Sequence, residues 1–238
     1  MTALVCLHGW SMDGRIWADA ARRLAPRFRV IAPDLPGHGA AQGFPPTVDG
    51  AAEMLRGLVA GAGPVTLVGW SLGATVAWRY LARFGGEGVR GMVAVDMSPR
   101  IARAPDWTLG LRGGLALPQA PAAIAEGMFG RAGTSPVLPR AEAEARIAAC
   151  DLGAMAAVWA SLIEADERAG IARLPVPMLV IHGAQSRLYP AATAEWLAAT
   201  APRARRLRFA GSGHSPHLEE PERFAAAVGD FAGAFQPT

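Results

Sequence analysis

The sequence predicts an α/β fold, built on a mostly parallel sheet of about six strands with helices on both faces. Two observations carry this prediction. Short apolar runs alternate with longer helical stretches along most of the chain, which is the rhythm of strands joined by helices. The chain also has 238 residues with 51% hydrophobic and 18% charged content, which is enough to bury one core. We therefore expect one α/β domain with an insertion.

Six short apolar runs are expected to form the strands. They comprise residues 3–7, 28–32, 65–68, 89–95, 176–181 and 206–209. The last run overlaps the densest basic stretch of the chain, residues 203–208, which we interpret as a solvated sheet edge. Helical stretches separate most of the runs, so the strands should lie parallel to one another.

Helices are expected between and after these strands, and they would cover both faces of the sheet. They comprise residues 16–24, 48–60, 72–84, 191–199 and 221–235. The last helix opens with Pro221, and proline is favoured in the first turn because its missing N–H is not needed there.

Residues 99–173 break the strand rhythm, and we call this segment the insertion. Its expected helices, which glycines and prolines separate, are residues 121–129, 139–150 and 152–169. The chain should accordingly divide into a first part of the core, the insertion and a second part of the core, at residues 1–98, 99–173 and 174–238.

Residues 69–73 read Gly-Trp-Ser-Leu-Gly, between an apolar run and a helical stretch. This is the pattern of a nucleophile elbow, in which a strand turns sharply into a helix and the two glycines remove side chains that would collide. Ser71 would then stand exposed at the carboxyl edge of the sheet. The motif alone is equally compatible with a glycine-rich turn that has a capping serine.

Three further segments extend the pattern to nearly the whole chain. Residues 4–10 read LVCLHGW, residues 34–39 read DLPGHG and residues 211–214 read GSGH. With the elbow between them, this order resembles the alpha/beta-hydrolase superfamily, which implies the alpha/beta-hydrolase fold. The resemblance also implies that the insertion forms a helical cap over Ser71 and sets the shape of the pocket. Superfamily members usually begin with an antiparallel hairpin, but this chain reaches its first strand at residue 3, so we expect none at that edge.

A serine hydroxyl is a weak nucleophile and needs a neighbouring base, which in turn needs an orienting acceptor. His214 is the expected base, because its glycine-rich loop follows the last strand and lets the ring reach the elbow. Three of the remaining histidines, His8, His38 and His182, are interpreted as structural hydrogen-bonding residues. The fourth, His217, is expected to be a second contact near the pocket.

The acid departs from the usual superfamily pattern. Most members place an aspartate a few residues after the strand predicted at 176–181, where this chain has Ser186. Asp96 follows the strand at 89–95 and should emerge at the same edge as Ser71, so we expect Asp96 to orient His214. Ser186 would be a supporting fourth member. The alternative is that Asp96 only caps the following turn. Asp34, in the turn motif, is interpreted as structural.

The backbone N–H groups of Trp10 and Leu72 are the expected oxyanion donors, since they lie beside the elbow in this arrangement. Trp10, Trp70 and Phe129 are the expected apolar contacts of the substrate. No metal site and no cofactor are expected, because the sequence has no metal-ligand spacing and no phosphate-binding loop.

The composition limits the classes of binding partner that we expect for this chain. All 23 basic residues are arginine and the formal net charge is only +3, whereas a nucleic-acid surface needs a broad basic field with stacking aromatics. No apolar stretch approaches the roughly 20 residues that span a bilayer. Cys6 and Cys150 fit two free thiols better than a disulfide. We expect a cytoplasmic monomer without nucleic-acid or membrane partners.

The elbow, the segments named above and the ending from His214 to Phe224 resemble the carboxylesterases that cleave pimeloyl-acyl-carrier-protein methyl ester in biotin synthesis. The resemblance implies a serine carboxylesterase that hydrolyses small carboxylic esters through an acyl-enzyme. The alternatives are a lactonase or thioesterase with the same triad, or a hydrolase-fold binding protein with little activity.

If the ester is carried on acyl carrier protein, arginines of the insertion are the candidates to meet that acidic partner. They are Arg103, Arg112, Arg131, Arg140 and Arg146. The competing interpretation, which the sequence favours, is a mixed solvated surface, because acidic residues are interleaved with these arginines.

Overall fold

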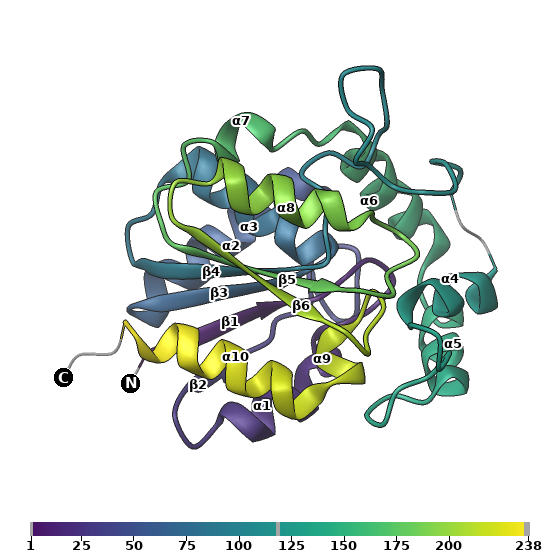
Figure 1. Ribbon diagram of the computed structural model, residues 1–238, viewed down its shortest axis with the longest axis horizontal. Coiled ribbons are helices and arrows are strands. Elements are labelled where there is room, and N and C mark those ends of the chain that lie inside the picture. Colours follow the sequence, from purple (N-terminus) through teal and green to yellow (C-terminus); the bar gives the residue numbers. More distant parts are fainter. Residues whose placement is uncertain (1, 118–119, 236–238) are drawn as a thin grey trace.

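The computed structural model describes residues 2–117 and 120–235 and contains one six-stranded sheet (Figure 1). Its order is β2-β1-β3-β4-β5-β6, and every neighbouring pair is parallel. The strands are β1 (Ala3–Leu7), β2 (Arg29–Ile31), β3 (Val65–Trp70), β4 (Val89–Val95), β5 (Met178–Gly183) and β6 (Ala204–Phe209). The predicted α/β class and strand number are confirmed.

Alternation along β1 shows how the sheet separates two hydrophobic layers. Ala3, Val5 and Leu7 belong to one buried cluster, and Leu4 and Cys6 belong to the other. Successive side chains of a strand point to opposite faces, so a strand buried on both faces is largely apolar. This accounts for the mostly apolar sequences of the central strands.

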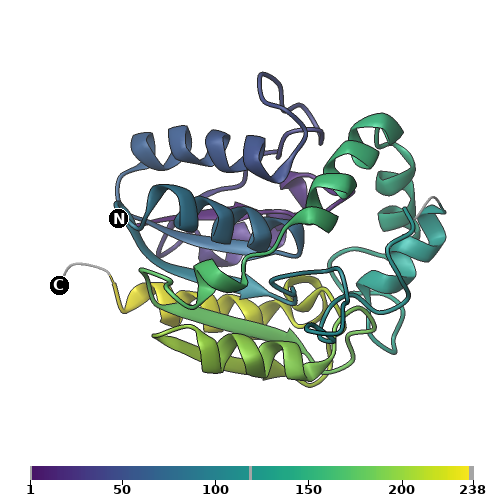
Figure 2. The same cartoon turned by 90° about the horizontal axis from the view of Figure 1, so that it is seen from above.

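Helices cover both faces (Figures 1 and 2). On one face lie α2 (Val48–Ala62), α3 (Leu72–Phe84) and α8 (Ala191–Thr200), and on the other lie α1 (Ala18–Leu24) and α10 (Pro221–Gly233). The short helix α9 (Pro216–Glu219) precedes α10. These are the five predicted helices, but the first begins at Ala18 and not at residue 16. Residues 14–17 form a tighter turn, η1 (Gly14–Trp17), because the Asp13 carboxylate accepts from Arg15 N at the start of that turn.

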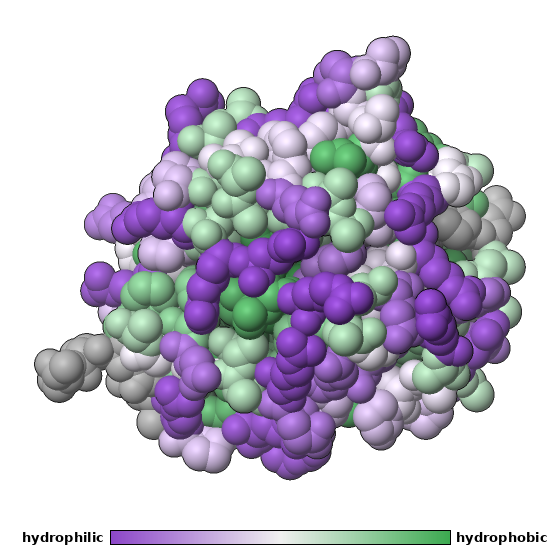
Figure 3. Space-filling model, viewed as in Figure 1, coloured by the Kyte–Doolittle hydropathy of each residue, from purple (hydrophilic) through white to green (hydrophobic). Residues whose placement is uncertain are grey.

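The strand β6 lies at the edge of the sheet and carries the basic stretch. Its residues 204–208 are exposed or half-buried, and Phe209 is buried. Figure 3 shows the face around β6, α8 and α10, where hydrophilic side chains are interleaved with apolar ones. The predicted solvated edge is therefore present.

The insertion leaves the sheet after β4 and returns to it at β5. It contains α4 (Pro121–Met128), α5 (Arg140–Ala148), α6 (Leu152–Glu164) and α7 (Arg168–Ile171). Helices α4 and α5 pack together beyond the carboxyl ends of the strands (Figures 1 and 2).

The helix predicted at residues 152–169 ends earlier, at Glu164. Asp166 pairs with Arg100 in an isolated bridge, and Glu167 N donates to Pro99 O, so the chain leaves the helix to bind the segment after β4. Glu167 is buried and forms an ion pair with Arg79 of α3 at 2.7 Å.

Taken singly, no helix of residues 2–117 and 120–235 has the length and apolar character to cross a membrane; α5 and α6 meet that test only as a pair, bent by 99° at their junction.

Candidate active site

Ser71 lies in the turn between β3 and α3, with φ of 52°, a value that L-residues seldom adopt. The glycines on either side are required by close backbone approach. A Cβ on Gly69 would lie 2.5 Å from Ala74 N, and a Cβ on Gly73 would lie 2.2 Å from Leu7 O. The turn therefore has the geometry of the predicted elbow, and Ser71 lines a pocket beside it.

Backbone strain is concentrated around this edge of the sheet. The described non-glycine residues with positive φ are Ser11, Ser71 and Asp96, which follow β1, β3 and β4. Such conformations persist where the surrounding structure holds them, and they gather at functional sites.

Asp96 and His214 meet at the base of this pocket. The Nδ1 atom of His214 lies 2.8 Å from Oδ2 of Asp96, and both residues are buried. The Nδ1 atom carries the proton of this hydrogen bond, since an ionised carboxylate only accepts. The structure thus brings together the two residues that the sequence analysis paired.

Ser186 supports the same carboxylate. Its hydroxyl donates to Oδ2 of Asp96 at 2.6 Å, and it also accepts from Tyr189 N at 3.4 Å. This hydrogen bond places Ser186 beside the carboxylate, and its role as a supporting fourth member stays a prediction.

His182 is the partner that sequence reasoning missed. Its Nδ1 lies 2.8 Å from Oδ1 of Asp96, and Gly183 N donates to the same oxygen at 3.3 Å. The contact follows from the strand register: parallel β4 and β5 pair Val95 with Ile181, so the residues that follow, Asp96 and His182, come side by side.

The Asp96 carboxylate is therefore saturated with donors. Burial alone would raise the pKa of Asp96, but the hydrogen bonds from His182 and His214 outweigh burial and lower the pKa to about 2. The carboxylate stays ionised at neutral pH, which is the form that stabilises an imidazolium beside it.

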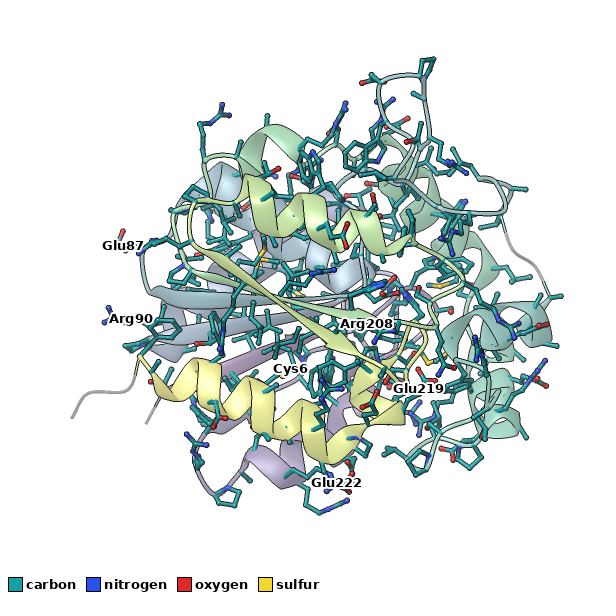
Figure 4. The ribbon with its side chains drawn as sticks, viewed as in Figure 1. Cys6, Glu87, Arg90, Arg208, Glu219 and Glu222 are labelled. Atoms are coloured by element: carbon teal, nitrogen blue, oxygen red, sulfur yellow. The ribbon has the colours of Figure 1, made fainter. Side chains whose placement is uncertain are left out.

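Two glutamates hold the loop that carries His214. Glu219, labelled in Figure 4, accepts from Gly213 N at 2.8 Å through one oxygen and from Gly130 N of the insertion at 2.6 Å through the other. Glu220 accepts from Gly211 N at 2.9 Å and from the Ser212 hydroxyl at 2.7 Å. Both carboxylates stand next to the start of α10, where a glutamate is ordinarily interpreted as a helix-terminal residue, so no sequence signal pointed to the histidine loop.

The predicted oxyanion donors lie beside the pocket. Trp10 and Ser71 both line it, and α3 begins at Leu72, directly after Ser71. Within the described residues, neither Trp10 N nor Leu72 N donates a hydrogen bond. Both groups therefore retain their hydrogen-bonding capacity for a ligand.

The pocket has a volume of about 360 Å³ and is lined largely by apolar side chains. The indole of Trp10 donates to Met155 O at 3.0 Å and packs against Trp159, with ring centroids 5.0 Å apart. The indole of Trp70 donates to His214 O at 2.7 Å. Both tryptophans line the pocket, where the sequence analysis expected substrate contacts.

Phe129 does not line the pocket, so its expected substrate contact is corrected. Helix α4 ends at Met128, and Phe129 takes an extended backbone with a fully buried side chain in the hydrophobic layer that contains Trp70. The insertion contributes Ile124, Gly127 and Met128 to the pocket instead.

His217 lies behind Trp70 and outside the pocket lining. Its ring centroid is 4.7 Å from that of Trp70 and 4.5 Å from that of Trp17, and neither ring nitrogen has a partner in the described part of the chain. Burial lowers the pKa of His217 to about 3, so the ring is neutral. The structure gives it a packing role.

The insertion arginines differ in their surroundings. Arg140 and Arg146 form ion pairs with Glu144 and Glu142 of the same helix. Arg103 and Arg131 are exposed and form no ion pair with the described residues, and Arg112 borders the pocket. In the described ranges, no group of three or more histidine, cysteine, aspartate or glutamate side chains is arranged to hold a metal ion.

The sequence is similar to known proteins along most of its length. A model of the alpha/beta hydrolase family matches residues 4–227. A pimeloyl-[acyl-carrier protein] methyl ester esterase of Aromatoleum aromaticum is 33% identical, with 95% of this chain and 96% of the relative covered. A protein of the same name from Nitrosomonas europaea is 31% identical, with 94% and 92% covered.

Solved structures show the same fold. An esterase from Exiguobacterium antarcticum matches with a TM-score of 0.85 at 20% identity, covering 97% of this chain and 91% of that chain. A thermophilic esterase from Thermogutta terrifontis matches with a TM-score of 0.82 at 24% identity, covering 98% and 90%.

Proposed function

The chain belongs to the alpha/beta hydrolase family, and on this basis we propose that it is a serine carboxylesterase that hydrolyses small carboxylic esters through an acyl-enzyme. The observation that carries the proposal is the 2.8 Å contact between Asp96 and His214 beside the strained serine of the elbow. The esterase names of its relatives agree with this assignment.

The reaction follows from the roles of three side chains. His214 takes the proton of the Ser71 hydroxyl as its oxygen attacks the ester carbonyl, and the tetrahedral intermediate forms. His214 then gives this proton to the departing alkoxy oxygen, which leaves as the alcohol. A water molecule attacks the acyl-enzyme by the same sequence and releases the carboxylic acid and Ser71.

Asp96 fixes the His214 ring and stabilises its charged form during both proton transfers. The N–H groups of Trp10 and Leu72 stabilise the negative oxygen of each tetrahedral intermediate. The serine at position 186 made a hydrolase-fold binding protein a plausible alternative, and the hydrogen bond of His214 to the Asp96 carboxylate on the neighbouring strand supports the enzyme instead.

We propose further that the ester is a methyl ester of an acyl group carried on acyl carrier protein, as the names of the relatives state for those proteins. Arg103 and Arg131 are the candidates to contact the acidic carrier, since they are exposed and unpaired with carboxylates of the described residues. Arg140 and Arg146 are less available, because each already has a glutamate partner.

An active-site label tests the proposal. A fluorophosphonate should add to Ser71 in the wild-type protein and not in Ser71→Ala, as read by mass spectrometry of the labelled peptide. A p-nitrophenyl ester of a short acid should be hydrolysed with an initial burst of p-nitrophenol if deacylation is the slower step. A label on another residue, or wild-type turnover retained by Ser71→Ala, would contradict the assignment.

A further inference from the structure

The wall of the pocket carries one permanent charge. Among the described residues that line it, Arg112 is the only arginine, and there is no aspartate or glutamate. The other side chains are aromatic, aliphatic or small, apart from Ser71, His214 and the buried Tyr189, whose pKa is raised by burial. A cation without a carboxylate partner beside an apolar pocket attracts an anion.

The backbone of Arg112 is fixed to the loop that follows β5. Its N–H donates to Leu188 O at 2.9 Å, and Leu188 itself lines the pocket. Its Nη1 donates to Ser186 O at 3.3 Å. The side chain therefore lies against the loop whose Ser186 hydroxyl binds Asp96, on the same side of the pocket as the acid.

Most donors of this guanidinium remain unused. An arginine side chain has five N–H groups, and the 3.3 Å contact with Ser186 O is the one hydrogen bond that they form to the described residues. Other arginines in and near the insertion do have carboxylate partners: Arg100, Arg140, Arg146, Arg168 and Arg187. Arg103 and Arg131 also form no ion pair with the described residues, but of these three arginines only Arg112 lines the pocket.

The next two residues keep this side of the pocket open. Gly113 and Gly114 also line it, with φ of 84° and 94°, and a Cβ on either would meet no atom of the described residues within 4 Å. Arg112 itself is exposed. An anionic group can therefore approach the guanidinium without displacing the protein atoms described there.

We propose that Arg112 binds an oxyanion carried by the ester, so that the pocket favours esters with an aliphatic chain between the reacting carbonyl and an anionic group. The proposal rests on the function proposed above and names its substrate class. The planar guanidinium can bind a carboxylate or a phosphate through two N–H groups. The anion is either the free carboxylate of a dicarboxylic half-ester or the phosphate of a carrier's prosthetic arm.

Three methyl esters separate these sources. Methyl heptanoate has a neutral chain, monomethyl pimelate has the same chain length with a terminal carboxylate, and the phosphopantetheine thioester of monomethyl pimelate adds a phosphate. Each is assayed with the wild type, with Arg112→Gln and with Arg90→Gln. Arg90 is an exposed arginine of β4 at the end of the sheet remote from α4 and α5 (Figure 4), and it serves as the matched control.

Arg112→Gln should raise KM for the anionic ester about 10-fold, the size expected for one charge-assisted hydrogen bond, with kcat little changed. Its KM for methyl heptanoate should stay within about 2-fold of the wild type, since no charge is lost in that complex. Arg90→Gln should leave KM for all three esters unchanged. The ester that loses affinity identifies whether carboxylate or phosphate is bound.

An equal rise of KM for the neutral and the anionic esters in Arg112→Gln would show that Arg112 only shapes the pocket wall. An unchanged KM for both anionic esters would also overturn the inference. Binding is also measured without turnover, by calorimetry of all three esters with Ser71→Ala and with the Ser71→Ala, Arg112→Gln double variant. If the wild type hydrolyses none of the esters, the proposed function fails, while a preference for the anionic ester that disappears with Arg112→Gln still supports the subsite. Absence of that preference overturns the subsite itself.

Discussion

The hydroxyl of Ser186 donates a 2.6 Å hydrogen bond to Oδ2 of Asp96. Two neighbouring strands thus present the two residues to each other, the carboxylate from β4 and the hydroxyl from beyond β5. The superfamily resemblance led us to expect the acid where Ser186 stands, but the carboxylate that faces His214 comes here from the neighbouring strand.

This proximity predicts that the acid can be moved back. Asp96→Ser should lower kcat by several orders of magnitude, and adding Ser186→Asp should recover at least about 10-fold of that loss, because a carboxylate at 186 starts within reach of the same imidazole. Steady-state turnover of a p-nitrophenyl ester measures both the loss in Asp96→Ser and the recovery in the double variant. A double variant no faster than Asp96→Ser would show that position 186 cannot serve His214.

His182 should act as a positioning residue. Its Nδ1 holds Oδ1 of Asp96 at 2.8 Å, which directs Oδ2 to His214. His182→Leu should reduce kcat about 10-fold with little change in KM, since it removes one hydrogen bond to a buried charge. His182→Asn keeps an N–H donor at the same distance from Cβ and should be closer to wild type.

Proton NMR separates this role from simple packing. The wild type should show two downfield Nδ1 proton resonances, one from each histidine. His182→Leu should lose one and shift the other. An unshifted His214 resonance combined with wild-type kcat would remove His182 from the mechanism.

Acid should lower the free energy of unfolding through protonation of Asp96. The folded-state pKa of Asp96 is lowered from its ordinary 3.8 to about 2. The ionised carboxylate therefore stabilises the fold above roughly pH 4, and this contribution is lost as the pH falls from about 4 to about 2. Across that window, the free energy of unfolding should fall by about 2 kcal/mol more in the wild type than in Asp96→Asn. Urea titrations at several pH values measure this difference, and parallel pH curves would refute it.

The glutamate that holds the histidine loop should matter for turnover. Glu219 accepts from Gly213 N, Ser215 N and Gly130 N, so an amide at this position places a donor against backbone donors. Glu219→Gln should lower kcat about 10-fold, through loss of a charge-assisted contact to the loop. Glu222→Gln, at a nearby exposed residue of α10, is the matched control (Figure 4). Equal activity of the two variants would contradict the role of Glu219.

The sequence was informative where chemistry follows from strand order. Ser71, Asp96 and His214 each follow a strand, and parallel strands end at one edge, so their placement at that edge could be predicted without coordinates. The role of His182 depends on the register that pairs Val95 with Ile181, and strand patterns alone do not give that register.

The direction of the Phe129 side chain and the partners of Glu219 and Glu220 could not be predicted, because they depend on contacts between separate elements. Phe129 follows the last residue of α4, where a change from helical to extended backbone turns the side chain into the core. The hydrogen bonds of Glu219 and Glu220 join residues of separate elements. Apolar periodicity carries no information on such contacts.

Whether the acid of the site lies on β4 is decided by comparing the turnover of Asp96→Asn with that of Ser186→Ala. An amide at position 96 cannot stabilise the His214 imidazolium and favours the wrong tautomer. Its kcat should therefore fall by about 10⁴, the loss seen when the triad aspartate of a serine protease is replaced by asparagine, with little change in the far-ultraviolet circular dichroism spectrum. Ser186→Ala should lose about 10-fold or less, because the carboxylate keeps its other donors. A larger loss in Ser186→Ala than in Asp96→Asn would show instead that position 186 carries the orienting role.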